Sequence, residues 1–298
     1  MITTADAQDQ ADPFLTHRRL LFAAAYRMLG SVADTEDVLQ DAWLKWAAVD
    51  QGAVQQPKAY LVRVVTNLAL NRLTSAQARR ESYVGPWLPE PVLTEPDAAE
   101  RAELTDSVSM AMLVVLETLS PLERAVFVLR EVFGYSHAEI AGTLERSEAS
   151  IRQTAHRAKA HVQARRPRFD ADPAQRRQVT ERFLAACATG EARAVMELLA
   201  PEVIAWSDGG GVVRAARRPL YGPDHVARWL LGVLAKPDAQ GMTASFEWIN
   251  GEQSLLFTVG DTTLGVLCLE VREGRIQALR AQLNPHKLAG VRPGAPVS

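Results

Sequence analysis

Apolar residues recur at helical spacing along the first part of the chain. Segments 20–29, 34–49 and 58–73 each repeat apolar side chains every three or four residues, which indicates amphipathic helices. In segment 34–49 the repeating residues are Val38, Leu39, Ala42, Trp43 and Trp46. Asp34 is placed to act as the N-cap of that helix. We therefore predict a bundle of three or four helices over residues 13–80.

A second helical block is predicted between residues 103 and 166, where start signals recur. The words SPLE at 120–123 and SHAE at 136–139 each place a Glu three residues after a Ser, the pattern of a capping box. The second word begins a short helix, and after a brief break a longer helix begins with Ser147 as its cap. This spacing is typical of a helix-turn-helix.

The longer helix has one apolar and one polar face. Its apolar face holds Ile151, Ala155, Ala158 and Val162. Its outward face holds donors suited to base edges and phosphates: Arg152, Gln153, His156, Arg157 and Lys159. The pattern favours binding to the DNA major groove. The alternative is a solvated basic face on an ordinary helical hairpin.

After residue 173 the pattern changes. Helices ending at Gly190 and near Leu199 are followed by five segments with strand character, separated by short turns. These segments are VIAWS, ASFEWI, SLLFTV, LGVLCLEV and RIQALRAQL. Helices followed by strands predict an α+β domain with an antiparallel sheet. The fold class is therefore multidomain, with two all-α modules and an α+β domain.

The segment 83–97 joins the two helical blocks and is rich in proline and acids, as linkers often are. Its Tyr83, Trp87 and Leu88 are unusually apolar for a free linker. Residues 80–104 carry two bases and six acids, whereas residues 136–168 carry seven bases and three acids. The basic charge is therefore concentrated on the helix-turn-helix.

Composition excludes several classes of protein. The 298 residues have a formal net charge of −2, so bulk positive charge cannot drive binding to nucleic acid. Neither a membrane-spanning segment nor a secretory signal is visible, and we expect a cytoplasmic protein without membrane partners. Cys187 and Cys268 stand alone, which argues against a disulfide framework and a zinc site.

The helical blocks together resemble extracytoplasmic-function sigma factors of the sigma-70 family. The words that carry the resemblance are DTEDVLQDAWLKW, AYLVRVVTNLALNRL and LSPLERAVFVLREVFGYSHAEIAGTLERSEASIRQTAHRAKAHV. The resemblance covers residues 13–165. It implies that residues 13–80 form region 2, 81–104 a linker and 105–166 region 4. The implied partners are core RNA polymerase, through its β′ and β subunits, and promoter DNA.

The resemblance also implies roles for single residues. Arg63, Asn67 and Asn71 lie on one polar stripe and match positions that contact the −10 element. The alternative is that they are three surface polar residues of an amphipathic helix. Arg152, Gln153, His156 and Arg157 would read the −35 element. Thr154 stands where many relatives have a base, which suggests weaker phosphate anchoring.

An acidic cluster near the start of the second helix resembles the surface that docks on polymerase β′. Its members are Asp34, Glu36, Asp37 and Asp41. By itself such a cluster often only compensates a helix dipole. The resemblance favours the docking interpretation.

Residues 174–290 resemble a SnoaL-like cone, the fold of nuclear transport factor 2, found as an extension in a subgroup of these sigma factors. Three words carry this resemblance: YVGPWLPEP (83–91), WSDGGG (206–211) and NPHKL (284–288). His286 departs from the Asp that many relatives have. The resemblance implies regulation in cis, with interdomain contacts at Trp87, Asp208, Gly209, Gly210, Gly211, Asn284, Pro285 and Lys287. Alternatively, the last two words are ordinary turns.

Two other function classes remain possible at this stage. The cone could bind a small ligand, or use Asp208, Asp224 and His225 for acid–base catalysis. A DNA-binding repressor with a ligand domain would explain the helix-turn-helix and the cone but not the first helical block. We expect no catalytic residue, no metal and no cofactor in a sigma factor of this kind.

Overall fold

The computed structural model describes residues 12–94, 109–165 and 172–292, and divides the chain into two units. One unit comprises Met1–Ala76 and Leu119–Lys159, and the other comprises Gln77–Thr118 and Ala160–Ser298. The rest of the acidic linker (95–108) and residues 166–171 lie outside the described residues. The predicted domain boundaries therefore stay predictions.

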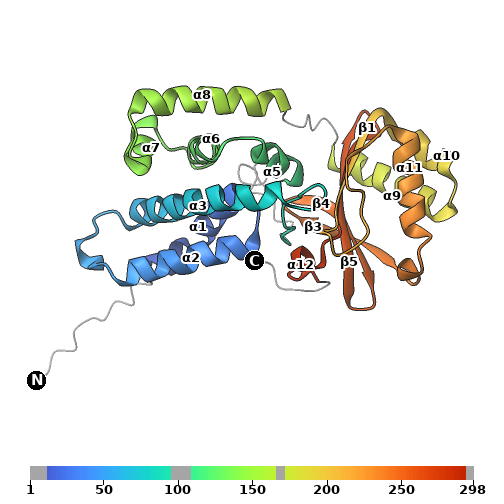
Figure 1. Cartoon of the computed structure of the whole chain (residues 1–298), viewed down its shortest axis with the longest axis horizontal. Helices are drawn as coiled ribbons and strands as arrows, with labels where there is room; N and C mark the ends of the chain where they lie inside the picture. The colour runs from blue at the N-terminus through green and yellow to red at the C-terminus, as the bar shows by residue number, and fades with distance from the viewer. Residues whose placement is uncertain (1–11, 95–108, 166–171, 293–298) are drawn as a thin grey trace, which may run out of the picture. The chain divides into compact units, whose positions relative to one another are not determined.

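The first unit is helical. Its elements are α1 (Pro13–Leu29), α2 (Val32–Ala47), the 3₁₀ turn η1 (Gln51–Ala53), α3 (Pro57–Glu81), α6 (Pro121–Phe127), the π-helical turn η2 (Val128–Val132), α7 (His137–Leu144) and α8 (Glu148–Arg165). The boundary with the second unit falls within α3 and α8. Helices α1, α2 and α3 lie side by side (Figure 1).

Most of the helix N-caps predicted from the sequence form in the structure. Ser120 and Ser136 each form a complete capping box with the Glu three residues later, and Ser147 accepts a hydrogen bond from the backbone N–H of Ser150. The predicted cap of α2 is wrong. Ser31, not Asp34, is its N-cap and accepts from the N–H of Asp34, because the helix begins three residues earlier than the predicted cap implies.

Two buried arginines tie the first helical block to the second within this unit. Arg124 of α6 donates to the carbonyl of Met28 near the end of α1 at 2.6 Å. Arg27 lies over the ring of Phe133, with its guanidinium carbon 5.9 Å from the ring centroid. Burial lowers the pKa of Arg27 to about 10. The helices predicted for regions 2 and 4 therefore share one packed core.

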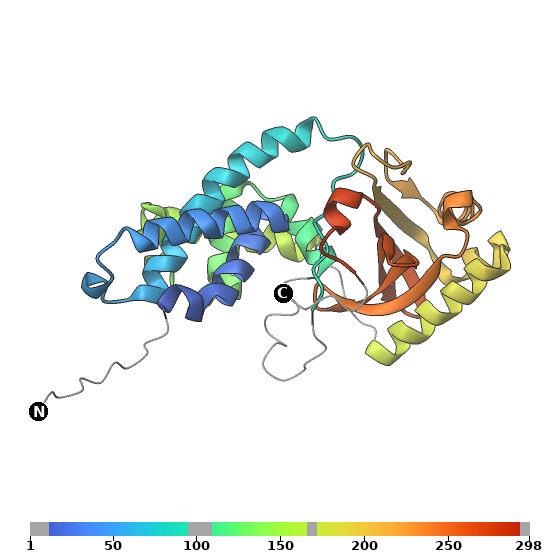
Figure 2. The same cartoon turned by 90° about the horizontal axis from the view of Figure 1, so that it is seen from below.

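The second unit is built on a curved six-stranded sheet in the order β2-β1-β6-β5-β4-β3 (Figure 2). Its strands are β1 (Leu199–Asp208), β2 (Leu220–Tyr221), β3 (Thr243–Ile249), β4 (Glu252–Val259), β5 (Thr262–Arg272) and β6 (Arg275–Gln282). The expectation of a purely antiparallel sheet is wrong, since β1 and β6 pair in parallel. The prediction of an α+β domain is confirmed.

Each face of the sheet has its own cover (Figure 1). One face packs on α9 (Pro173–Thr189), α10 (Ala192–Leu198) and α11 (Pro223–Leu234) around an apolar core that includes Phe183, Val203 and Leu279. The other packs on Leu93 of the linker, Met110 at the start of α5 (Met110–Glu117), and Leu288 of α12 (Pro285–Leu288). The short 3₁₀ turn η3 (Pro237–Ala239) follows α11. Among the described residues no helix is long and apolar enough to span a bilayer.

Candidate functional site: a clamp on the linker

The parallel pairing of β1 and β6 brings two distant sequence words together. Parallel strands end at the same edge of a sheet, and here Asp208, the last residue of β1, pairs in register with Gln282, the last residue of β6. The glycine run 209–211 continues from β1, and the word NPHKL at 284–288 follows β6. Both words therefore meet at one edge of the cone.

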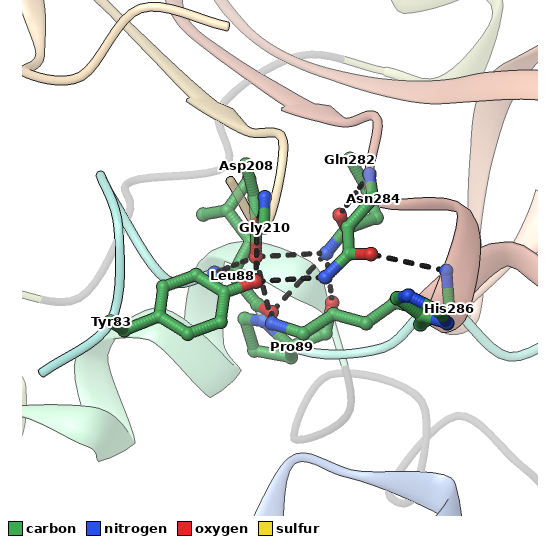
Figure 3. Close-up of polar contacts among 9 residues, drawn as sticks. Tyr83, Leu88, Pro89, Asp208, Gly210, Gln282, Asn284 and His286 are labelled. Carbon is green, nitrogen blue, oxygen red and sulfur yellow. Dashed lines mark hydrogen bonds and ion pairs between the residues drawn. The ribbon is translucent and has the colours of Figure 1, made fainter. Parts of the chain in front are cut away.

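The carboxylate of Asp208 is the centre of this edge and is fully buried (Figure 3). One oxygen accepts hydrogen bonds from the Tyr83 hydroxyl at 2.7 Å and the Gly210 N–H at 3.0 Å. The other oxygen accepts from the Leu88 N–H at 2.8 Å and pairs with the Lys287 ammonium at 2.7 Å. A buried charge needs such pairing and hydrogen bonding to be tolerated. Two of these partners belong to the linker.

Lys287 and Gln282 hold the backbone of the linker from the cone side. The Lys287 ammonium donates to the Leu88 carbonyl at 2.6 Å and lies 4.1 Å from the centroid of the Trp87 ring. The Gln282 amide nitrogen donates to the carbonyls of Leu88 and Pro89, each at 3.2 Å. Leu88 itself is buried. The apolar residues that seemed out of place in a linker are thus anchors.

Asn284 joins the remaining parts of the site. Its side-chain oxygen accepts from the His286 N–H and so caps α12, while its amide nitrogen donates to the Tyr83 hydroxyl at 2.9 Å. Burial and the neighbouring Asp208 carboxylate raise the pKa of Tyr83 above its usual value. The hydroxyl therefore keeps its proton for Asp208 at neutral pH. We call this site the linker clamp: Tyr83, Leu88, Pro89, Asp208, Gly210, Gln282, Asn284, His286 and Lys287.

A second attachment follows within a few residues. The Thr94 N–H donates to the carbonyl of Trp248, and the Asn250 N–H donates to the carbonyl of Val92, both at 2.8 Å. The side-chain oxygen of buried Asn250 accepts from the Val92 N–H at 3.0 Å. Leu93 forms an antiparallel bridge to Ile249 at the end of β3. The linker is therefore held on the cone from Tyr83 to Thr94.

The structure brings four of the eight predicted interdomain residues into this clamp and places the other four beside it. Asp208, Gly210, Asn284 and Lys287 lie within it, and Trp87 stacks beside Lys287. Gly209 and Gly211 form the adjoining turn, and Pro285 begins α12. Sequence reasoning missed Gln282 and Tyr83 as clamp residues. Their signals were a polar residue ending an apolar strand and an aromatic in a linker.

The three residues predicted to contact the −10 element lie on α3. Arg63 is exposed and lies over the ring of Tyr60, with 5.5 Å between its guanidinium carbon and the ring centroid. The Asn67 amide nitrogen donates to the carbonyl of Thr143 in α7 at 3.2 Å. Asn71 is exposed. Of the three residues, Asn67 therefore already uses its side-chain amide in a contact within the chain.

Helix α8 presents to solvent the residues that were predicted to read the −35 element. Arg152 forms an ion pair with Glu148 at 2.6 Å, and Arg157 forms one with Glu123 at 3.5 Å. Gln153 and His156, which were also predicted to face outward, are exposed. Thr154 is buried, so its position serves the core and not phosphate anchoring.

The acidic cluster on α2 is partly neutralised within the chain. Arg72 pairs with Asp34 at 2.8 Å and also with Asp37, and Arg18 pairs with Glu36 at 2.6 Å. Asp41 is exposed. Sequence reasoning placed Trp43 on the apolar stripe, but its side chain is 44% exposed, and its neighbour Leu44 is exposed as well. An exposed apolar pair beside acids fits a docking surface.

The residues considered for catalysis are separately engaged. Asp208 belongs to the clamp, Asp224 pairs with Arg228 within α11, and a ring nitrogen of His225 contacts the carbonyl of Tyr221 at 3.1 Å. Within the described residues, no group of three or more His, Cys, Asp or Glu side chains is arranged to hold a metal ion. Burial raises the pKa of Cys187 to about 11, and burial also raises that of Cys268, to about 12, which leaves both as unreactive thiols.

Comparison with known proteins identifies the modules. Residues 14–79 match Sigma-70 region 2, and residues 109–162 match Sigma-70, region 4. The chain is 36% identical over 295 residues to the ECF RNA polymerase sigma factor SigJ of Mycobacterium tuberculosis, covering 94% of each chain. It is 32% identical to the probable ECF RNA polymerase sigma factor SigI of the same species, covering 93% of each.

The solved structures support the same assignment. The crystal structure of the Mycobacterium tuberculosis extracytoplasmic function sigma factor SigJ matches with a TM-score of 0.73 and 34% identity, covering 96% of this chain and 99% of that one. The similarity thus extends through the helical modules and the cone. The chain belongs to the extracytoplasmic-function sigma factors of the sigma-70 family.

Proposed function

We propose that this sigma factor binds core RNA polymerase, directs initiation at promoters with −10 and −35 elements, and is restrained in cis by its own cone. The observation that carries the restraint is the linker clamp, in which the buried Asp208–Lys287 pair holds the backbone at Leu88. Arg63, Asn67 and Asn71 are proposed to contact the −10 element, and Arg152, Gln153, His156 and Arg157 the −35 element. Asp34, Glu36, Asp37 and Asp41 are proposed to dock on polymerase.

The contacts between the region 2 helices and the region 4 helices suggest that these helices must separate before they bind a promoter. Two elements 25 positions apart on B-form DNA are separated by roughly 85 Å at about 3.4 Å per base pair. In the structure, Arg124 of the region 4 match donates to Met28 of the region 2 match, and Asn67 donates to Thr143. Helices joined by such contacts cannot reach both elements at once. We propose that they separate on the promoter.

The clamp limits that separation. Between the end of α3 at Glu81 and the start of α5 at Met110 lie 28 residues, which can span roughly 95 Å when extended. With the chain held on the cone from Tyr83 to Thr94, only the 15 residues between Thr94 and Met110 can extend towards α5, and they span roughly 50 Å at most. Release of the clamp therefore lengthens the tether between the modules.

The first prediction tests this restraint with Asp208→Asn. The amide keeps the size of the carboxylate but leaves the Lys287 ammonium without its counterion, so the linker should detach. We expect several-fold more initiation by polymerase reconstituted with this variant. The measurement is in vitro transcription on fragmented genomic DNA with sequencing of RNA 5′ ends, which needs no known promoter.

The matched control is Asp238→Asn, which removes the same charge from an exposed position in the cone. It should leave initiation unchanged. A pull-down with core polymerase checks that both variants still bind. Reduced initiation by Asp208→Asn, with polymerase binding intact, would show that the cone supports activity instead of restraining it.

Three further assignments follow from the proposed role. Phosphodiester chemistry belongs to polymerase, so the chain needs no catalytic residue of its own. Because it works with polymerase, we place it in the cytoplasm. A small ligand in the cone is not required by the clamp.

A further inference from the structure

The turn that follows β1 carries a dense positive charge. Residues 209–219, GGGVVRAARRP, contain three arginines and no acidic residue. The acidic residue that directly precedes this segment in the sequence, Asp208, is buried and paired with Lys287. We call this segment the arginine loop. Its local charge of +3 contrasts with a whole-chain charge of −2.

The guanidinium groups of the arginine loop are available for a partner. Arg214, Arg217 and Arg218 are exposed, and none of them forms an ion pair within the part of the chain that the structure describes. Val212 and Val213, which precede them, are 57% and 40% exposed. Three other exposed arginines of the cone, Arg177, Arg193 and Arg228, have an acidic neighbour one helical turn away. The arginine loop lacks such compensation.

The backbone of the loop is held in place. The Ser207 hydroxyl accepts a hydrogen bond from the Ala216 N–H at 2.8 Å, and the Gly209 carbonyl accepts from the N–H groups of Val212 and Val213. Gly210 is bound to the Asp208 carboxylate at 3.0 Å. A loop fixed at both ends presents its charges with less loss of entropy on binding than a free tail would.

The arginine loop and the linker together line a hollow. A hollow of about 340 Å³ is lined by Val84 and Gly85 of the linker together with Arg214, Arg217 and the glycine turn. A Cβ atom placed on Gly211 would lie 3.3 Å from the Cβ of Val84, so the two segments are in direct contact. The arginine loop therefore lies immediately beyond the end of α3, which stops at Glu81.

Chain connectivity limits how far this loop can be from the proposed −10 contacts. Asn71 and Val84 are 13 positions apart in the sequence, so even a fully extended backbone between them spans at most about 45 Å. About 13 base pairs of B-form duplex cover that length. Duplex DNA there offers closely spaced phosphate groups.

We propose that Arg214, Arg217 and Arg218 bind phosphate groups of the duplex next to the −10 element, without reading its sequence. This inference rests on the proposed function, since it requires that α3 contacts promoter DNA. Arginine guanidinium groups bind phosphate oxygens through paired N–H donors. The cone then has a second role besides holding the linker, because its arginine loop adds affinity for DNA.

Salt dependence tests the inference. Each phosphate contact releases about one counterion, so losing three contacts lowers the slope of log K against log[NaCl] by roughly 2 to 3. The full-length chain is titrated into a fluorescein-labelled 40-base-pair duplex of random sequence, and anisotropy is followed from 20 to 200 mM NaCl. We expect the triple variant R214A/R217A/R218A to show this smaller slope and at least tenfold weaker binding at low salt.

Two controls make the result specific. The variant R193A/R228A/R275A removes the same charge from exposed positions on α10, on α11 and at the start of β6, and its slope should equal that of the unaltered chain. The variant R214K/R217K/R218K keeps the charge and should keep the slope. Equal slopes for the loop variant and the unaltered chain, an equal drop in the R193A/R228A/R275A control, or no binding by the unaltered chain at 20 mM NaCl would overturn the inference.

Two further outcomes separate the inference from the proposed function. If R152A/R157A abolishes transcription while the arginine loop variant retains its salt slope, the sigma factor assignment stands and the phosphate contact fails. If the loop variant instead loses core polymerase in a pull-down and keeps its affinity for DNA, the loop binds an acidic protein surface. That outcome also overturns the phosphate contact.

Discussion

At the scale of single residues, the clamp depends on a position where no side chain fits. Gly210 has a φ of +62°, in the left-handed region that favours glycine, and a Cβ atom there would overlap the amide group of Asn284. Its N–H is also bound to Asp208. Glycine thus lets the turn approach the segment that follows β6 closely enough for both to share one carboxylate.

Gly210→Ala should therefore weaken the clamp. A strained left-handed backbone costs of order 1–3 kcal/mol, and the displaced Asn284 would lose its hydrogen bond to Tyr83. We expect a lower midpoint of thermal unfolding for the cone, followed by circular dichroism of the full chain. Gly232→Ala is the control, because this glycine lies in the exposed face of α11 with no atom near its Cβ position. It should stabilise the helix by roughly 0.5–1 kcal/mol. Equal losses at both sites would contradict the role given to Gly210.

The residues of the clamp could be predicted from sequence only in part. The glycine run and the word NPHKL mark positions with special backbone needs, and Asp208 stands out beside them. That Asp208 contacts Lys287, 79 positions later, follows only from the parallel pairing of two strands. Local pattern carries no information on which strands pair. For the same reason the polar end of β6 marks Gln282 as unusual but does not reveal that it donates to two linker carbonyls.

At the scale of elements, α8 combines a buried stripe with an exposed polar face. Ile151, Ala158 and Val162 are buried, whereas Arg152 and Arg157 are exposed and paired with single glutamates. Exposed ion pairs of this kind contribute at most about 1 kcal/mol each. On the proposed role of α8, promoter DNA would displace the glutamates at little cost, and both arginines would exchange carboxylate partners for bases and phosphates.

Changing Arg152 and Arg157 together to Ala should abolish promoter-directed transcription without loss of polymerase binding. Each good contact to a base is worth roughly 1–3 kcal/mol, so losing two lowers occupancy of the promoter by at least tenfold. The measurements are run-off transcription and a core polymerase pull-down. Arg177→Ala, another exposed arginine in a helical i,i+4 pair, is the control and should have no effect. Loss of polymerase binding in the double variant would indicate that α8 is structural.

Local signals predicted elements better than they predicted packing. The two capping boxes were predicted because a Ser and a Glu three residues apart interact within one helical turn. The exposure of Trp43 could not be predicted, since helical period shows which residues share a face and not where that face ends. The residues that pack on the second face of the sheet could not be predicted either. It comes from Leu93, Met110 and Leu288, which belong to three separate segments.

At the scale of the whole molecule, the proposed restraint requires the cone to act through the chain that joins the helical modules. The linker carries anchors that are useful only where a cone is present. Leu88 is 1% exposed, and its N–H and carbonyl groups are both bound by cone side chains. In a chain that ends at Arg165, the same leucine has no cone to pack against. The effect of changing it should therefore depend on the rest of the molecule.

Leu88→Ala should raise initiation in the full-length chain and change nothing in a chain ending at Arg165. Truncating a buried leucine costs roughly 2–5 kcal/mol, enough to shift the linker towards its released state. The truncated chain is already released, so its initiation should be high with either residue. The four proteins form a double-mutant cycle, and its interaction energy measures how strongly the cone and the linker are coupled. Run-off sequencing with reconstituted polymerase supplies the rates, normalised to the amount of sigma factor bound. An equal effect of Leu88→Ala in both chains would mean that this residue serves initiation directly, and the restraint would have to be sought in another contact.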